Sequence, residues 1–263
     1  KSSKIRPLGE SDSYAEVSSI LNRENVDRGV FSPVRGVQNV VLPALQRWGG
    51  KYLLSVEPSG SFAKGTCNLS GTDIDLFCSL SSDTPDTLQQ IYTSLCAQMS
   101  QSGYVIKKQN VSVGITVGNF KVDLVPAKRQ SQFGNDHSLY RSRADTWTKT
   151  NVQTHISTVS GSGRTNEIRI IKLWRDQQGI DIPSIYLELL VIDALRGHSL
   201  SSLSNNVLQV FTYIRDNLSY KKIVDPANTS NVISDELNVA EKQRVITAAQ
   251  TALLATNWNQ IVI

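Results

Sequence analysis

The chain has 263 residues, of which 40% are hydrophobic and 19% charged, and this composition indicates a globular protein with room for one large domain or two lobes. It holds no apolar run of membrane-span length and no signal-type segment at its polar start, so we expect a cytoplasmic protein with no membrane partner. A net charge of +4 suits a polyanionic substrate without requiring one, and the three cysteines, which have no zinc spacing, are expected to be buried free thiols.

The first half of the chain alternates between helical and extended patterns. One helix is expected over 14–25, and a second begins at Ser32-Pro33, an N-cap followed by a first-turn proline, and stops at Gly49-Gly50. The expected strands are 52–56, 72–80, 104–108, 111–117 and 119–125, with a helix over 87–101 covering them. Residues 51–126 are therefore predicted to form a small mixed sheet.

Pro126 marks a change in this pattern. Residues 127–150 are polar, basic in places and without clear periodicity, so we expect a functional loop or a linker there. The rest is expected to be helical, over 151–159, 164–178, 183–196, 203–218 and 235–257. The predicted fold class is α+β, with a catalytic sheet core over 51–126 packed against a helical lobe formed by residues 1–50 and 127–263, and with the active site in the cleft.

Two alternating carboxylates stand out in the strand expected at 72–80. Side chains of a strand alternate between its faces, so Asp73 and Asp75 project side by side while Ile74 faces the core. Carboxylates held that close repel each other unless a cation lies between them, and Mg²⁺ is bound in this way. Two alternatives are a solvated acidic turn and a calcium loop. The flanking apolar residues disfavour the acidic turn, and the calcium loop is excluded because Phe77-Cys78 stands where it requires a ligand and a glycine.

A third carboxylate lies in the later strand that contains Asp123. An aspartate in an apolar strand needs a partner or a function, and a two-metal site needs more negative charge than one pair supplies. We therefore expect Asp73, Asp75 and Asp123 to hold two Mg²⁺ ions, with Mn²⁺ as a substitute, for an in-line displacement at an α-phosphate that releases pyrophosphate. Asp123 would hold the ion on the nucleophile side and accept the hydroxyl proton.

A glycine–serine turn precedes these carboxylates. Gly60 allows close approach of the backbone to a ligand, and Ser61 is expected to open a short helix whose N-terminus would bind a triphosphate. Thr66-Cys67 stands where a Walker A loop requires lysine and serine or threonine, so this is not a Walker A loop. A plain helix-capping turn is the alternative.

These elements together resemble the catalytic signature of the DNA-polymerase-β-like nucleotidyltransferases. Later segments resemble one branch of that superfamily, which includes oligoadenylate synthases, cyclic GMP–AMP synthase and their bacterial relatives, the CD-NTases of anti-phage signalling. The matching segments are Gly60-Ser61, Asp73-Ile-Asp75-Leu, Val122-Asp123-Leu124-Val-Pro, Arg169-Ile-Ile-Lys172-Leu-Trp-Arg, Pro183-Ser184-Ile-Tyr-Leu-Glu and Ile223-Val-Asp225-Pro226.

The resemblance implies a synthase of cyclic di- or trinucleotides, or of short oligonucleotide messengers, from NTPs such as ATP and GTP. It implies that Lys172 and Ser184 contact the donor triphosphate, that Asp225-Pro226 forms a structural turn near the cleft, that an RNA or a protein activates the enzyme, and that a downstream effector binds the product. From the residues alone, the helix with Lys172 has the pattern of an ordinary helix with a core stripe and a solvated charged face, and Glu188 could simply cap or pair.

Two other functions stay open. The first is an RNA 3′-end nucleotidyltransferase, of the CCA-adding or tRNA-modifying toxin type, which the basic stretch over 127–150 favours and the compact chain disfavours. The second is a catalytically dead nucleotide-binding sensor, which the intact set of three carboxylates disfavours.

Overall fold

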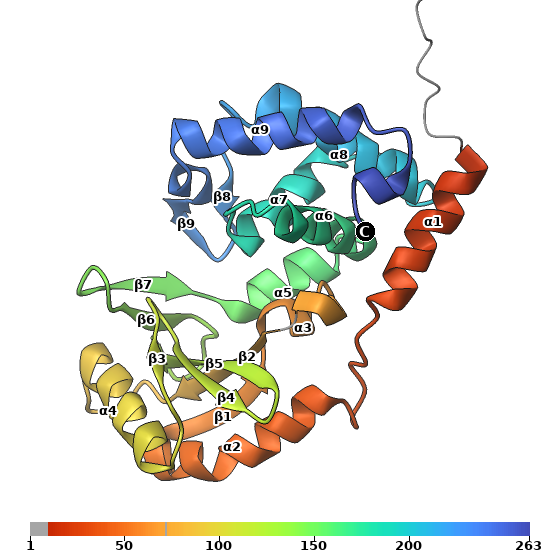
Figure 1. The fold of residues 1–263 in the computed structure, drawn as a ribbon. Helices are drawn as coiled ribbons and strands as arrows, with labels where there is room; N and C mark the ends of the chain where they lie inside the picture. The colour runs from red at the N-terminus through yellow and green to blue at the C-terminus, as the bar shows by residue number, and fades with distance from the viewer. Residues whose placement is uncertain (1–9, 72) are drawn as a thin grey trace, which may run out of the picture. The chain divides into compact units, whose positions relative to one another are not determined.

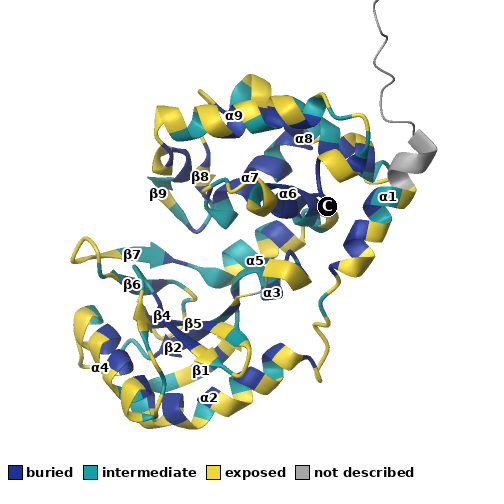
Figure 2. Cartoon of the chain, in the orientation of Figure 1, coloured by how far each residue is buried: buried dark blue, intermediate teal, exposed yellow. Residues whose placement is uncertain are grey.

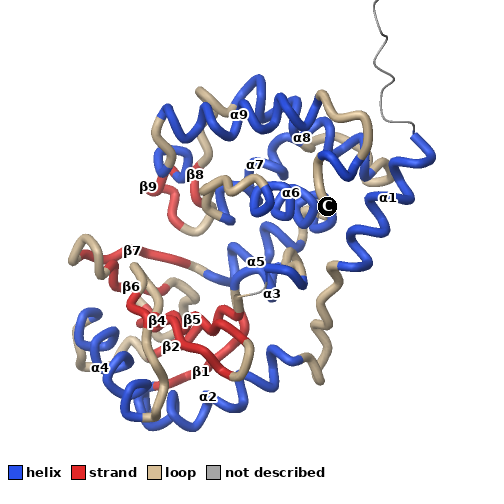
Figure 3. The backbone as a smooth tube through the Cα atoms, in the orientation of Figure 1, coloured by secondary structure: helices blue, strands red, loops and turns tan. Residues whose placement is uncertain are grey.

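The computed structural model describes residues 10–71 and 73–263, and its chain divides into two compact units. Of the described residues, 10–26, 66–71 and 158–263 form a helical unit, and 27–65 with 73–157 form a sheet unit. The contrast between strands and helices is visible in Figure 3. The expected α+β class is confirmed, whereas the boundaries of the units differ from the expected ones.

One mixed sheet forms the centre of the sheet unit. In the described part of the chain it has seven strands, with β2 and β5 parallel and the other pairs antiparallel (Figure 1). The order is β1 (Leu53–Pro58), β2 (Ile74–Leu80), β5 (Phe120–Arg129), β4 (Val113–Val117) and β3 (Lys107–Lys108), and β6 (His137–Arg141) pairs with β5 and β7 (Thr146–Thr150). Thr72, the first residue of the strand expected at 72–80, lies outside the described residues.

Two helices, α2 (Pro33–Gly49) and α4 (Leu88–Gln101), contact strands of the sheet and each other (Figure 1). The Ser32 side chain caps α2 at the Arg35 N–H, as expected, and a capping box at Thr87 begins α4. Along β2, Ile74, Leu76 and Cys78 are fully buried, so the alternating Asp75 lies on the opposite face of the sheet.

Three expectations about the sheet unit are wrong. Residues 1–50 were expected in the helical lobe, but α2 packs on β1 and β2, so residues 27–50 belong to the sheet unit. The stretch expected to be irregular over 127–150 contains the end of β5 and both β6 and β7. Pro126 does not end β5, because the strand continues in register with β2, where Pro126 faces Cys78. The strand expected at 104–108 is confined to β3, at 107–108.

The helical unit is built mainly from five helices. They are α1 (Glu10–Arg23), α6 (Thr165–Gln177), α7 (Ser184–Ala194), α8 (Leu203–Asn217) and α9 (Val239–Leu253), with α5 (Val152–Ser160) leading into them from the sheet unit. Trp174 and Phe211 meet edge-to-face in the core at 4.9 Å between ring centroids. Figure 2 shows that α6 and α7 are largely buried, whereas α9 has an exposed side.

The remaining elements of this unit are short. They are η2 (Leu69–Gly71), β8 (Val224–Asp225), β9 (Asn228–Val232), η3 (Ile233–Glu236) and η4 (Trp258–Gln260), whereas η1 (Gly50–Tyr52) belongs to the sheet unit. The turn expected at Asp225-Pro226 is the tip of the β8–β9 hairpin, where the Ala227 N–H donates to the Asp225 carboxylate at 2.8 Å. The helix expected over 235–257 begins later, because a capping box at Asn238 starts α9 after η3.

All three cysteines are free and buried, as expected. Within residues 10–71 and 73–263, none of the helices has the length and apolar character that a membrane span requires.

Candidate active site

The Gly60 turn lies directly against a carboxylate of the sheet. β1 leads into α3 (Gly60–Lys64), and the Ser59 N–H donates to the Asp75 carbonyl at 2.8 Å, which ties the turn to β2. Gly60 has φ +55°, and a Cβ added to it would overlap Asp75 Oδ2 at 1.7 Å. Only glycine fits this position, for both the backbone angle and the space.

Ser61 is the second residue of α3, so the helix opens one residue earlier than expected. The N-cap is Ser59, whose side chain makes no capping hydrogen bond in the structure. The alternative of a plain helix-capping turn stays open. Ser61 is partly exposed and adjoins Gly60, while its proposed contact with a triphosphate stays a prediction.

The three predicted carboxylates lie on, or directly before, two strands that are neighbours in the sheet. Asp75 and Asp123 are paired in the parallel register of β2 and β5, so their side chains lie on the same face of the sheet. Asp73 precedes β2 and is exposed. Burial raises the pKa of the Asp123 carboxyl above its ordinary value, and the negative charge of Asp73 raises this pKa further. Asp73 is therefore close enough to Asp123 for its charge to act on that carboxyl, whereas a shared metal site of the three carboxylates stays a prediction.

Two residues that the sequence analysis did not single out oppose this shift. The Gln109 side-chain amide donates to Asp123 Oδ1 at 2.7 Å, and Lys107 on β3 adds positive charge, and both lower the pKa of Asp123. Gln109 lies in a polar loop without a motif, so the sequence held no signal for its role.

Mg²⁺ fits the chemistry of this carboxylate set, because it binds oxygen ligands and is held in proteins by one or two carboxylates, with water and phosphate completing its coordination. Asp75 and Asp123 supply such a pair on adjacent strands, and Asp73 is close enough to influence Asp123. Among the described residues, no group of three or more His, Cys, Asp or Glu side chains meets the geometry of a metal site, so the binding of Mg²⁺ by these carboxylates stays a prediction.

A small pocket opens beside Asp75. Its volume is about 190 Å³, with Ser59, Gly60 and Lys64 on one side and the apolar side chains of Phe77 and Val125 on the sheet. The apolar wall belongs to a small cluster formed by Phe77, Ala127 and Leu139. Of the three predicted carboxylates, Asp75 therefore lines this cavity together with the Gly60 turn.

Lys172 and Ser184 belong to the helical unit, where each has a protein partner. Lys172 is buried, with Nζ 3.5 Å from Glu188 Oε1, which also accepts a hydrogen bond from the Thr66 hydroxyl at 2.8 Å. Ser184 accepts a hydrogen bond from Arg175 at 2.9 Å. Glu188 thus pairs in the core, as its alternative interpretation held, and the contacts of Lys172 and Ser184 with a triphosphate stay predictions.

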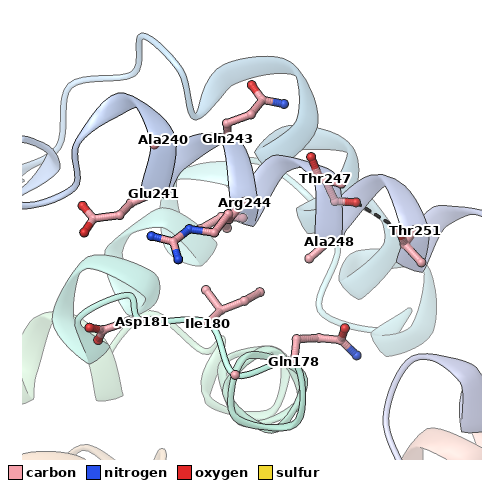
Figure 4. Close-up of a pocket in the computed structure, with 12 residues that line it drawn as sticks. Gln178, Ile180, Asp181, Ala240, Glu241, Gln243, Arg244, Thr247, Ala248 and Thr251 are labelled. Carbon is pink, nitrogen blue, oxygen red and sulfur yellow. Dashed lines mark hydrogen bonds between the residues drawn. The ribbon is translucent and has the colours of Figure 1, made fainter.

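A larger pocket, of about 560 Å³, lies within the helical unit between the end of α6 and α9. Figure 4 shows Arg244 of α9 opposite Ile180 and Asp181 of the chain that follows α6. None of the predicted site residues lines it.

Comparison with known proteins places this geometry in a known fold. No protein-family model and no curated protein sequence matches the chain. Among solved structures, the chain is similar to CdnC of E. coli MS115-1 in complex with HORMA-deltaN, with a TM-score of 0.75 and 19% identity over 97% of each chain. It is similar to the CD-NTase CdnG of Bradyrhizobium diazoefficiens in complex with GTP, with a TM-score of 0.73 and 13% identity over 91% of each chain.

The chain is also similar to the Cid1 poly(U) polymerase, with a TM-score of 0.66 and 12% identity over 93% of this chain and 94% of that one. The chain therefore has the nucleotidyltransferase fold of the CD-NTases, which confirms the fold that the resemblance implied.

Proposed function

We propose that the chain is a Mg²⁺-dependent nucleotidyltransferase that makes a cyclic di- or trinucleotide, or a short oligonucleotide messenger, from NTPs such as ATP and GTP. The observation that carries the proposal is the pairing of Asp75 and Asp123 on adjacent parallel strands, with the Gly60 backbone against the Asp75 carboxylate. Solved structures of the same fold include CdnG in complex with GTP and CdnC in complex with HORMA-deltaN. We extend the proposal to bacterial anti-phage signalling, with a protein or RNA activator and a downstream effector that binds the product.

The chemistry follows from the placement of the acidic groups. When bound, two Mg²⁺ ions would stabilise the departing pyrophosphate and lower the pKa of the attacking hydroxyl. Asp73 and Asp75 would hold both ions, and Asp123 would hold the one on the nucleophile side. We further propose that Asp123 takes the proton of the attacking hydroxyl.

The nucleotide is held by groups of a different kind. Backbone N–H groups at Gly60 and Ser61 would bind the triphosphate, since a helix N-terminus favours anions. Lys172 and Ser184 would add a cation and a hydroxyl to the same phosphates. Most of the rate enhancement would come from positioning and electrostatics, since no covalent enzyme intermediate is needed.

Pyrophosphate release tests the proposal. Replacing Asp73 and Asp75 together by asparagine keeps the side-chain shape and removes two negative charges, so we expect NTP turnover to be lost and the unfolding temperature to be kept. Asp136→Asn, a carboxylate paired with Lys149 in the same unit, is the matched control and should remain active. Pyrophosphate release by the double variant at the wild-type rate would overturn the assignment.

Product analysis separates the proposed messenger from the second candidate, an RNA 3′-end nucleotidyltransferase. The similarity to Cid1, whose TM-score approaches those of the CD-NTases, favours that second candidate. Incubation with labelled NTPs, with and without tRNA, followed by chromatography and mass analysis, distinguishes the two. Free small nucleotides support the messenger, whereas label on RNA supports the RNA enzyme.

A further inference from the structure

One side chain next to the carboxylates has a role that the proposed chemistry does not include. The Gln109 amide nitrogen donates to Asp123 Oδ1 at 2.7 Å, and the amide oxygen accepts from the Ser112 hydroxyl at 3.1 Å. The bond to Asp123 fixes the orientation of the amide, because an ionised carboxylate only accepts and must face the amide nitrogen, and the Ser112 hydroxyl then donates to the amide oxygen.

The backbone of Gln109 is held as firmly as its side chain. Its N–H donates to the Ser112 carbonyl at 3.0 Å and to the Tyr92 hydroxyl at 3.1 Å. Its carbonyl accepts from the hydroxyls of Tyr92 and Ser142, both at 2.7 Å. Tyr92 is a buried residue of α4, so the loop that carries Gln109 is anchored to a helix of the sheet unit.

The space around the amide is also restricted. A Cβ added to Gly114 on β4 would lie 3.0 Å from Gln109 Nε2 and 3.2 Å from Asp123 Oδ1, which is closer than ordinary van der Waals contact. Gly114 is the register partner of Asp123 across β4 and β5. The absence of a side chain at this position leaves room for the pair of Gln109 and Asp123.

We propose that Gln109 is a positioning residue for Asp123, an inference that rests on the proposed nucleotidyl transfer. An amide nitrogen neither ligates a cation nor accepts a proton, so Gln109 acts through the carboxylate and not on the substrate. By holding Oδ1, it fixes the orientation of the carboxylate, whose other oxygen, Oδ2, would then be the one to bind the nucleophile-side cation. Groups that orient a metal ligand in this way affect metal affinity and activity when they are changed.

Removal of the amide is the first test. We expect Gln109→Ala to weaken Mn²⁺ binding and to lower kcat, each by roughly 10- to 100-fold. Mn²⁺ binding is measured without nucleotide, from the electron paramagnetic resonance signal of free Mn²⁺. The KM for NTP should change by less than about twofold, because Gln109 does not touch the substrate. Gln109→Glu has nearly the same size but cannot donate when ionised, so it should lower kcat similarly and covers the case in which the alanine variant does not fold.

Two further variants separate positioning from a general structural role. Ser112→Ala keeps the bond from Gln109 to Asp123 and should leave Mn²⁺ affinity within about threefold of wild type, whereas Gly114→Ala presses on both partners and should resemble Gln109→Ala. If Gln109→Ala and Gln109→Glu lower the unfolding temperature but keep Mn²⁺ affinity and kcat, Gln109 is structural and the inference is wrong. If the wild type itself binds no Mn²⁺, or binds it equally in the Asp73→Asn/Asp75→Asn variant, the proposed function is wrong instead.

Discussion

Replacement of Gly60 by alanine is a stringent test of the site, because Gly60 combines a left-handed backbone with a close approach to a carboxylate. The left-handed conformation at φ +55° would cost an alanine about 1–2 kcal/mol. In addition, the new Cβ would lie 1.7 Å from Asp75 Oδ2, and side chains essentially never approach a Cβ closer than 3.0 Å, so the carboxylate must shift by more than 1 Å. A displacement of that size at a reacting centre lowers the rate by roughly 100-fold.

Gly118 supplies a matched control in the same unit. It has φ +58°, and a Cβ added there meets nothing within 4 Å, so Gly118→Ala carries the backbone strain without the overlap. We expect Gly118→Ala to lose about 1–2 kcal/mol of unfolding free energy and keep its activity, and Gly60→Ala to lose more stability and about 100-fold in pyrophosphate release.

The overlap with Asp75 can be isolated by a double-mutant cycle, measured by denaturant unfolding of metal-free protein. In an Asp75→Ala background the obstructing carboxylate is absent, so Gly60→Ala should then cost no more than Gly118→Ala, and the coupling energy should be about 1 kcal/mol or more. Equal effects of Gly60→Ala in both backgrounds, together with near-normal turnover of the single variant, would refute the close packing of this turn on Asp75.

Two other predictions concern buried polar groups. Glu188→Ala removes a buried carboxylate that pairs with Lys172 at 3.5 Å and accepts from the Thr66 hydroxyl, and should lower the unfolding free energy by about 3–5 kcal/mol, whereas Asp216→Ala, at an exposed pair, should change it by less than about 1 kcal/mol. Urea titration measures both, and equal small effects would contradict the buried pair. Burial lowers the pKa of His137 below its ordinary value of 6.5, so the unfolded state takes up a proton first and stability should fall as the pH drops below about 6.5. This part of the pH dependence should vanish in His137→Gln and persist in the exposed His198→Gln, and its persistence in His137→Gln would contradict the assignment.

The carboxylates could be predicted from the sequence because their signal is local. Alternation along a strand places Asp73 and Asp75 on one face, and an aspartate inside an apolar strand marks Asp123. The sequence could not predict that Asp75 lies directly beside Asp123. That pairing depends on the parallel register of β2 and β5, and register follows from tertiary packing.

The parts that were missed depend on contacts between distant segments. The strands β6 and β7 are short and mostly polar, with only His137, Leu139 and Thr150 buried, so their alternation is too weak to recognise in a basic stretch. Gln109 gains its role from Tyr92, Ser112 and Asp123, which a linear pattern cannot connect. The placement of α2 in the sheet unit was also missed, because an amphipathic helix shows that it has a buried face but not what covers that face.

The path of the chain between the two units limits how the protein can be dissected. Residues 66–71 leave the sheet unit between Gly60 and Asp73 and are anchored among the helices, where Asn68 donates to the Arg169 carbonyl at 2.9 Å and the Ser70 N–H donates to Glu24 at 2.9 Å. Neither unit is thus one continuous stretch, and because residues 10–26 and 158–263 both belong to the helical unit, truncation into either of these segments would remove part of that unit. Insertional tags or permuted termini should therefore be placed in exposed turns such as 131–133, away from residues 66–71, which carry the chain from the Gly60 turn to Asp73.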